Sequence, residues 1–421
     1  MRKTLRFILF GLLALVLTTV VAVVLIVKLV LAPATGEWSA RIGLGPVQAD
    51  IGVPTVLRLA TSPWFAPHLA GHAVDTRHGR VVFGWREAAQ ALELRCAPCN
   101  ASVPALGAQP IVVDALTATV RRDGNLLAGQ LQVQPQAGAP GDTASPVQAQ
   151  WTGRLSQGNL QIDIDAKEAP IAQWYRALVP QLPELQRARI GGTLALRGKI
   201  TLPEESFSLQ PRIAGFTVEG LGTEALLNAR TSCGPSARLT QDSWLARAVI
   251  AAEDQRYATH PGYDLAELLA AADANQKRGQ VERGGSTLTQ QLAKMVMTGS
   301  ERTAERKLRE LLYAVEMEQT LGKARILLLY LDSAPWGAGV CGAEAAARRY
   351  FKRSARTLEP AQAVWLASML NKPSAAADEW KRTGSLDAAR VQWVAEGIRG
   401  IGRSQREALL KSVAAARFAL P

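Results

Sequence analysis

Two adjacent carboxylates, Glu253 and Asp254, stand at the end of the apolar segment 245–252. A carboxylate next to buried surface has a raised pKa, which makes it a better proton acceptor near neutral pH. The alternative is a solvated helix end that carries a carboxylate pair. His260 follows six residues later, and it either orients the two acids through hydrogen bonds or is purely structural.

A glycine-rich turn leads into the next chemical motif. Gly284, Gly285 and Ser286 precede Thr287, which has capping-box spacing to Gln290 and so predicts the start of a helix. We expect a buried stripe of Leu288, Leu292, Met295 and Val296, and an exposed face that carries Gln290, Gln291 and Lys294. Backbone N–H groups at such a turn, with a lysine nearby, suit a phosphate or diphosphate. The alternative, an ordinary capped surface helix, does not explain two glutamines and a lysine on one face.

A third group of charges follows on the segment that begins at Ala304. Arg306 and Lys307 are four and three residues from Glu310, so all three share one helix face, away from the buried leucines. A charged helix face is often merely solvated. The same two cations and one acid would also suit a site that stabilises a departing diphosphate.

The elements that must position these residues are helices. Apolar residues at helical spacing predict a helical domain over 233–421. The expected helices are 244–256, 265–277, 287–297, 304–321, 324–331, 343–351, 360–370 and 387–397.

The preceding part of the chain, residues 35–232, has a different texture. Alternating apolar and polar residues, separated by turn signals, predict a β-rich antiparallel domain with one helix over 170–182. The expected strands are 80–85, 91–95, 115–121, 126–134, 147–155, 159–166, 189–201 and 207–219.

Residues 1–34 predict a cytoplasmic tip and an uncleaved transmembrane anchor. The uncharged run from Phe7 to Val27 is long enough to cross about 30 Å of hydrocarbon, and Arg2, Lys3 and Arg6 precede it. The positive-inside bias then predicts a single-pass protein of the inner membrane with most of the chain in the periplasm. A net charge of +12 favours an anionic partner, and the membrane segment disfavours nucleic acid.

Four cysteines in an exported chain make disulfides plausible. Cys96 and Cys99 lack the context of a redox motif or zinc site, so we expect a local disulfide or two plain thiols. Pairing of Cys233 with Cys341 would then tie the start of the helical domain to its later helices.

Taken together, the motifs around Glu253–Asp254, Gly284–Lys294, Arg306–Glu310, Lys323–Phe351 and Leu358–Pro373 resemble those of glycosyltransferase family 51, the peptidoglycan glycosyltransferases. The resemblance implies a lysozyme-like fold and polymerisation of lipid II into glycan strands, with inversion and release of polyprenyl diphosphate. It implies that Glu253 is the general base and that Glu310 is the second essential acid. The cations around the leaving group would be Lys294, Arg306 and Lys307, where a divalent Mg or Mn ion could assist, and no organic cofactor is implied. The positions that the resemblance assigns to substrate binding also include Asp254, His260, Gly285, Ser286, Thr287, Gln290 and Gln291.

Residues 165–201 are similar to the β-rich repeats of AsmA-like envelope proteins, which implies lipid or partner contact; a simple spacer is the alternative. No Ser-x-x-Lys with a companion Lys-Thr-Gly element follows, so we expect no transpeptidase activity and partnership with transpeptidases or other cell-wall proteins. Two other functions stay open: a lysozyme-like glycan hydrolase, and a non-catalytic envelope lipid-binding or scaffold protein.

Overall fold

The chain divides into two units, each described here by itself. The computed structural model describes residues 12–19, 21–22, 25, 29–44, 47–101, 110–134, 145–278, 284–299, 301, 303–337 and 339–418. One unit, the sheet unit, comprises Met1–Ala101, Val112–Pro180 and Thr193–Ala214, and the other, the helical unit, comprises Ser102–Ile111, Gln181–Gly192 and Gly215–Pro421. The combination of a large antiparallel sheet with many helices is as predicted. The domain boundaries expected at residues 34 and 232 stay predictions.

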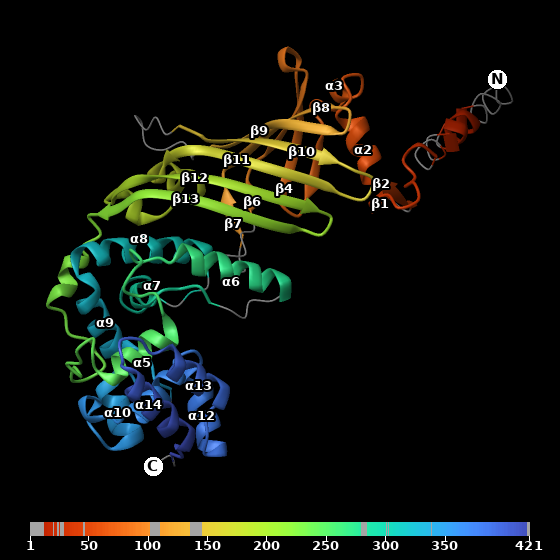
Figure 1. The fold of residues 1–421 in the computed structure, drawn as a ribbon. Coiled ribbons are helices and arrows are strands. Elements are labelled where there is room, and N and C mark those ends of the chain that lie inside the picture. The colour runs from red at the N-terminus through yellow and green to blue at the C-terminus, as the bar shows by residue number, and fades with distance from the viewer. Residues whose placement is uncertain are drawn as a thin grey trace, which may run out of the picture. The chain divides into compact units, whose positions relative to one another are not determined.

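The sheet unit is built around a nine-stranded sheet (Figure 1). Neighbouring strands follow the order β13-β12-β11-β10-β9-β8-β5-β4-β3, and each pair of neighbours from β3 to β12 is antiparallel. Its strands are β3 (Ala73–Thr76), β4 (Gly79–Arg86), β5 (Ala91–Cys96), β8 (Ala115–Asp123), β9 (Leu126–Gln134), β10 (Val147–Leu155), β11 (Leu160–Pro170), β12 (Arg189–Leu202) and β13 (Ser206–Glu219). The eight predicted strands are confirmed, because alternation is a strong signal wherever one face of a sheet is apolar.

One face of this sheet carries the core of the unit. Trp151 on β10 lies opposite Gly129 on β9, and its indole N–H donates to the carbonyl of Thr119 over 3.1 Å. A side chain at Gly129 could not fit, since its Cβ would lie 1.7 Å from that carbonyl oxygen. Helices α2 (Val53–Ala60) and α3 (Ala66–Leu69) supply Leu57, Ala66 and Leu69 to the same cluster.

The remaining elements of the sheet unit are short. Helix α4 (Ile171–Leu178) ends earlier than predicted, because Pro180 disfavours helical backbone at the residue before it. The sequence did not predict the pairs β1 (Ser39–Leu44) with β2 (Val47–Gly52) and β6 (Cys99–Ala101) with β7 (Ile111–Val113). Two 3-10 helices, η1 (Glu87–Ala89) and η2 (Pro183–Gln186), were also missed, and η2 belongs to the helical unit.

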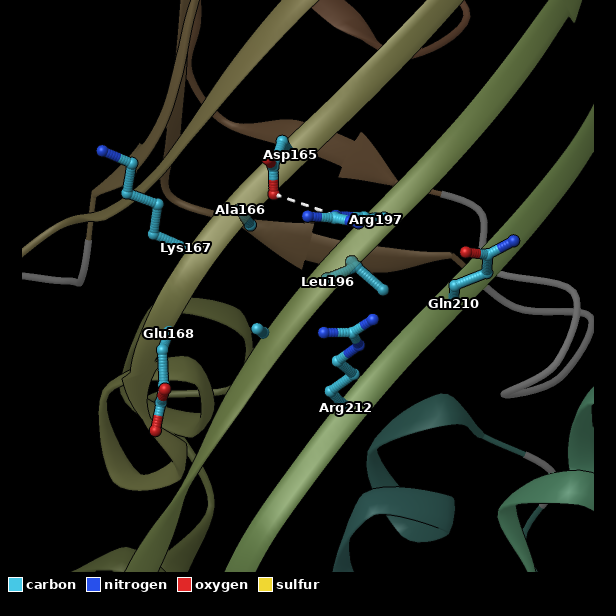
Figure 2. Close-up of a pocket in the computed structure, with 9 residues that line it drawn as sticks. Asp165, Ala166, Lys167, Glu168, Leu196, Arg197, Gln210 and Arg212 are labelled. Atoms are coloured by element: carbon cyan, nitrogen blue, oxygen red, sulfur yellow. Dashed lines mark ion pairs between the residues drawn. The ribbon is translucent and has the colours of Figure 1, made fainter.

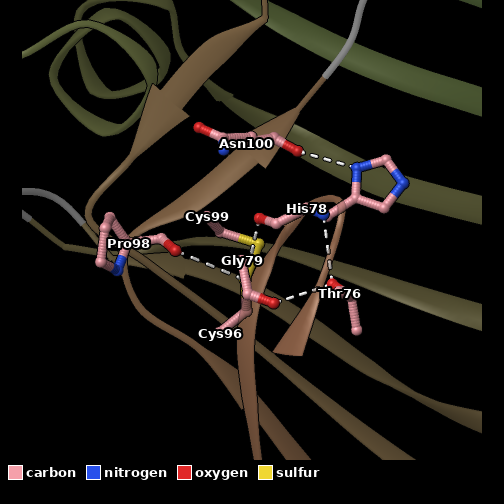
Figure 3. The surroundings of a disulfide bond; sticks show 7 residues. All are labelled: Thr76, His78, Gly79, Cys96, Pro98, Cys99 and Asn100. Carbon is pink, nitrogen blue, oxygen red and sulfur yellow. Dashed lines mark hydrogen bonds between the residues drawn. A yellow bond between two sulfur atoms is a disulfide. The ribbon is translucent and has the colours of Figure 1, made fainter. Parts of the chain in front are cut away.

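Of the two states expected for Cys96 and Cys99, the structure has the disulfide (Figure 3). The bond joins the end of β5 to the start of β6. Gly79 lies against it with φ of +127°, and a Cβ there would approach the carbonyl oxygen of Pro98 to 2.5 Å. Glycine is therefore required at this contact.

The helical unit is made almost entirely of helices in its described part. They are η3 (Thr223–Leu227), α5 (Trp244–Glu253), α6 (Leu265–Arg278), α7 (Leu288–Ala293), the π-helical η4 (Lys294–Thr298), α8 (Ala304–Thr320), α9 (Gly322–Ser333), α10 (Ala343–Phe351), η5 (Ala355–Thr357), α11 (Pro360–Ser368), α12 (Pro373–Thr383), α13 (Ala388–Gly397) and α14 (Arg403–Ala415). Helix α5 packs against α11 and α13. The eight predicted helices are present, and α12 and α14 were missed.

A second disulfide joins Cys233 to Cys341, as the sequence suggested. It connects the chain ahead of α5 to the residues just before α10. The expected membrane segment Phe7–Val27 is described only in part, over residues 12–19, 21–22 and 25, and Arg2, Lys3 and Arg6 lie outside the described residues. Among the residues that are described, no helix combines the length and the apolar character needed to cross a bilayer.

Candidate active site

Glu253 is the last residue of α5. The helix begins after Ser243, whose hydroxyl accepts from the N–H of Ala246, and it buries Leu245, Val249 and four alanines against the core. It ends three residues earlier than predicted, because Asp254 leaves helical geometry. Glu253 therefore lies at the edge of the core, with 11% of its side chain exposed.

Two groups hold the Glu253 carboxylate. The amide of Gln291 donates to Oε2 over 3.1 Å, and the guanidinium of Arg390 donates to Oε1, also over 3.1 Å. Tyr330 fixes the amide in turn by donating to Gln291 Oε1 over 3.0 Å. Burial raises the pKa of Glu253 and nearby Asp254 adds to the increase, whereas Gln291 and Arg390 oppose it. The net increase favours proton acceptance near neutral pH.

Asp254 has a different environment from Glu253. It is buried, and its carboxylate accepts from the backbone N–H of Leu288 at the start of α7 over 2.9 Å. His260 Nε2 faces the same carboxylate at 2.9 Å, and the N–H of Gly262 donates to Nδ1 over 3.2 Å. Since Nδ1 accepts, Nε2 carries the proton and donates to Asp254. The pair fastens the end of α5 to the start of α7, which is the orienting arrangement considered for His260.

The glycine-rich turn forms the predicted capping box. The hydroxyl of Thr287 accepts from the N–H of Gln290, and the amide oxygen of Gln290 accepts from the N–H of Thr287. Gly285 packs so closely on α6 that a Cβ would lie 2.9 Å from Leu268 Cα. The turn is therefore tightly specified by its residue types.

The predicted faces of this helix are partly wrong. Gln290 is buried, because its side chain closes the capping box, and it does not share an exposed face with Lys294. Leu288 and Leu292 are buried as expected, but Met295 is half-buried and Val296 is exposed. The change from α to π geometry at Lys294 shifts the side-chain period, which moves the stripe off the core.

Helix α8 brings the third group together. Its N-cap is Thr303, whose hydroxyl accepts from the N–H of Arg306 over 3.0 Å. Glu310 pairs with Arg306 and, over 3.1 Å, with Lys307. Of the two interpretations given for this face, the solvated one does not apply to Glu310, which is only 1% exposed; two cations offset the cost of burying its charge.

Lys307 connects α8 to the glycine-rich turn. Its ammonium donates to the hydroxyl of Ser286 and also pairs with Glu310. Burial, together with the positive charges of Arg306 and Lys294, lowers the pKa of Lys307 to about 8. The same electrostatic interaction places the exposed Lys294 near Lys307, which is half-buried.

Contacts thus run from Glu253 through Gln291 on α7, and from the turn before α7 to Lys307 on α8. Every predicted site residue takes part in these contacts, belongs to the turn and helix ends that hold them, or, like Lys294, lies near them. Sequence reasoning missed Arg390, which also donates to the carbonyl of Ala252 over 2.8 Å and lies over the ring of Trp393. No local signal identifies it, since 137 positions separate it from Glu253.

The described acidic residues of the site do not form a cluster of metal ligands. Within the described residues no group of three or more His, Cys, Asp or Glu side chains is placed to hold a metal. Glu253 and Glu310 are each already engaged by cations. Lysine and arginine are therefore the available counter-charges for an anionic substrate.

A separate depression lies on the sheet unit (Figure 2). Its volume is about 230 Å³, and Arg197 on β12 pairs with Asp165 on β11 at its wall over 3.8 Å. None of the predicted site residues lines it. The chemistry expected from the sequence therefore concentrates in the helical unit.

Comparisons with known proteins agree with this location. A family model described as Transglycosylase matches residues 236–398. The chain is 42% identical over 167 residues, 39% of its own length and 71% of the other protein, to the biosynthetic peptidoglycan transglycosylase of Thiobacillus denitrificans. It is 47% and 50% identical over 129 residues to the proteins of that name from Nitrosomonas eutropha and Cupriavidus pinatubonensis. These two matches cover 31% of this chain and 53% and 51% of those relatives, so the chain spans about half of their length.

Proposed function

The chain belongs to the biosynthetic peptidoglycan transglycosylases, and from this premise we propose that it polymerises lipid II into glycan strands and releases polyprenyl diphosphate. The observation that carries the proposal is the contact network of Glu253 with the helices that bear the cations. Relatives named for peptidoglycan transglycosylation support the reaction class. We assign the site to the helical unit, with a lysozyme-like fold.

Glu253 is the proposed general base. Each oxygen of its carboxylate accepts one hydrogen bond from the protein, which leaves a lone pair available to take a proton. As Glu253 takes the proton from the acceptor sugar's 4-hydroxyl, the hydroxyl oxygen forms a bond to the anomeric carbon of the donor. The bond from that carbon to the diphosphate oxygen breaks, and its electron pair leaves with the diphosphate. Attack from the face opposite the leaving group inverts the anomeric configuration.

Lys294, Arg306 and Lys307 are proposed to stabilise the negative charge that develops on the leaving diphosphate. Lys307 is held by Ser286 and Glu310 before substrate arrives, so little reorganisation is needed during the reaction. Gln291 orients the base, whereas Asp254, His260, Thr287, Gln290 and Gly285 fix the turn around it. A Mg or Mn ion would enter with the phosphates of the substrate rather than in a site of protein ligands alone.

We further propose that the protein works at the inner membrane with most of its chain in the periplasm, since a polyprenyl-linked substrate resides in the bilayer. Cross-linking would then fall to separate transpeptidases. The AsmA-like resemblance of residues 165–201 suggests that the sheet unit contacts envelope lipids or proteins. The membrane location and the contacts of the sheet unit are proposed from the sequence pattern. Protease protection of the chain in spheroplasts would test the orientation.

The decisive experiment measures glycan synthesis from lipid II by the full-length protein in detergent. Wild-type protein should yield glycan strands, and Glu253→Gln should lose at least about 100-fold in rate. Glu344→Gln on α10 is the matched control, because Glu344 is also a buried, hydrogen-bonded carboxylate. Full activity of the Glu253 variant would reject the assignment of the base. Release of muropeptides from finished glycan would instead favour the hydrolase, and no turnover of either substrate would favour the scaffold.

A further inference from the structure

Helix α8 carries two sets of interacting polar residues. Arg306, Lys307 and Glu310 form the cation group of the site. A second set, Arg309, Tyr313 and Glu316, contacts two chain segments that precede residue 236, where the match to the transglycosylase family begins. These two segments adjoin the long strands β12 and β13.

The first segment holds α8 through Glu184, in η2 just before β12. Glu184 is 2% exposed, and its Oε1 accepts from Arg309 over 2.8 Å and from the hydroxyl of Tyr313 over 3.2 Å. Arg187 donates to that same hydroxyl over 3.0 Å. A buried carboxylate with a cation and a hydroxyl on one oxygen fixes both partners in place, because breaking the pair would leave a buried charge uncompensated.

The second segment is held by Glu316, two turns further along α8. Glu316 is also 2% exposed, and its carboxylate accepts the backbone N–H groups of Leu221 over 2.6 Å and Thr223 over 3.2 Å, just after β13. The hydroxyls of Thr223 and Thr320 lie 2.8 Å apart. Burial of a carboxylate is costly unless its hydrogen bonds are met, and here the backbone of the second segment meets them. A helix that merely lay at the surface would not need such an arrangement.

We infer that Glu184 and Glu316 form a clamp that positions α8, and through it Arg306, Lys307 and Glu310, for the reaction. The inference rests on the proposed function. A helix moves as a rigid body, so a shift at Arg309 displaces its neighbours Lys307 and Glu310 by a similar amount, and an error near 1 Å can cost about 100-fold in rate. Through this clamp, residues that precede the family match at 236–398 help to hold the catalytic residues in place. Strands β12 and β13 are continuous in sequence with the two clamp segments, and these segments contact α8 through hydrogen bonds and an ion pair.

The test is steady-state polymerisation of lipid II by full-length variants. Glu184→Gln keeps the side-chain shape but removes the charge, and we expect kcat to fall about tenfold with KM within about twofold of wild type, because cation placement matters most in the transition state. Glu344→Gln, on α10, is the control: Glu344 accepts from the N–H of Ala355 and pairs with Arg348, and neither of these partners belongs to α8 or to the site network. Its kcat should match wild type even where its melting temperature falls.

A second variant guards against failure of Glu184→Gln to fold. Tyr313→Phe removes only the hydroxyl that bridges Glu184 and Arg187, and we expect kcat to fall about threefold. Wild-type kcat in both clamp variants, or in Tyr313→Phe where the other does not fold, overturns the clamp. An equal fall of kcat in Glu344→Gln also overturns it, because the effect would then be global. Inactivity of the wild-type protein on lipid II would instead reject the proposed function.

Discussion

Arg390 should determine how far the pH can fall before kcat/KM for lipid II polymerisation decreases, which is the acidic limb of the pH–rate profile. Its guanidinium lies 3.1 Å from Glu253 Oε1 and forms an ion pair with that carboxylate. Its charge favours the ionised carboxylate, so it opposes the increase in pKa that burial imposes on Glu253. Replacement by a neutral residue should therefore raise the pKa of Glu253 further.

The size of this effect follows from the geometry. Two unit charges at this distance interact by about 5 kcal/mol at an effective dielectric constant near 20. Both side chains retain some exposure, 21% for Arg390 and 11% for Glu253, so solvent screens part of that energy. We expect a shift of about 1 to 2 pKa units, or about 1.4 to 2.7 kcal/mol. The base must be deprotonated to act, so the acidic limb of kcat/KM for Arg390→Gln should move to higher pH by that amount.

The assay is kcat/KM for lipid II polymerisation as a function of pH, which reports groups of the free enzyme. Arg390→Lys is the matched control, because it retains a positive charge and should shift the limb by less than half as much. Circular dichroism and melting temperature at each pH separate titration from unfolding. An unchanged acidic limb in folded Arg390→Gln would refute the reasoning, and so would equal shifts in the two variants.

Three further predictions concern other parts of the molecule. Lys307 loses its charge as pH rises through its pKa of about 8, so rate should fall above that pH, and Lys307→Arg should remove this basic limb in the same kcat/KM profile. Reduction of the Cys233–Cys341 disulfide, whose cysteines are 108 positions apart, should cost about 2 to 5 kcal/mol in stability by denaturant unfolding, and Cys233→Ser/Cys341→Ser should reproduce it without reductant. EDTA should leave the melting temperature of the substrate-free protein unchanged and lower polymerisation less than about tenfold; a drop of several degrees would reveal a protein-held metal instead.

The fold was predictable where one face of an element is buried and the other is wet. Strands β9 and β10 have the predicted bounds, since apolar and polar residues alternate along them. Helices α12 and α14 were missed because each buries only two side chains, too few for a clear helical period. Helix α8 was found, but its buried Glu310 was not, because hydrophobic periodicity assigns a carboxylate to the surface by default.

The site was predictable to the extent that its chemistry is local in sequence. The capping box of Thr287 and Gln290 follows from a spacing of three residues, and the structure forms it. Arg390 and Glu184 reach α5 and α8 from distant parts of the chain, and neither sits in a pattern that implies a partner. Only the tertiary fold reveals these contacts, because residues far apart in the sequence meet without any pattern in the residues beside them.

The two acids of the site differ in what protonation would cost, and this difference assigns their roles. A proton on Glu310 would break its pairs with both Arg306 and Lys307 and would leave two half-buried cations without a counter-charge. A proton on Glu253 weakens one ion pair and relieves the cost of burying its charge, which is the largest influence on its pKa. Glu253 is therefore the better proton acceptor, and Glu310 is better suited to hold the cations in place. The environment of each carboxylate thus supports the roles proposed for Glu253 as the base and for Glu310 as the acid that organises the charges.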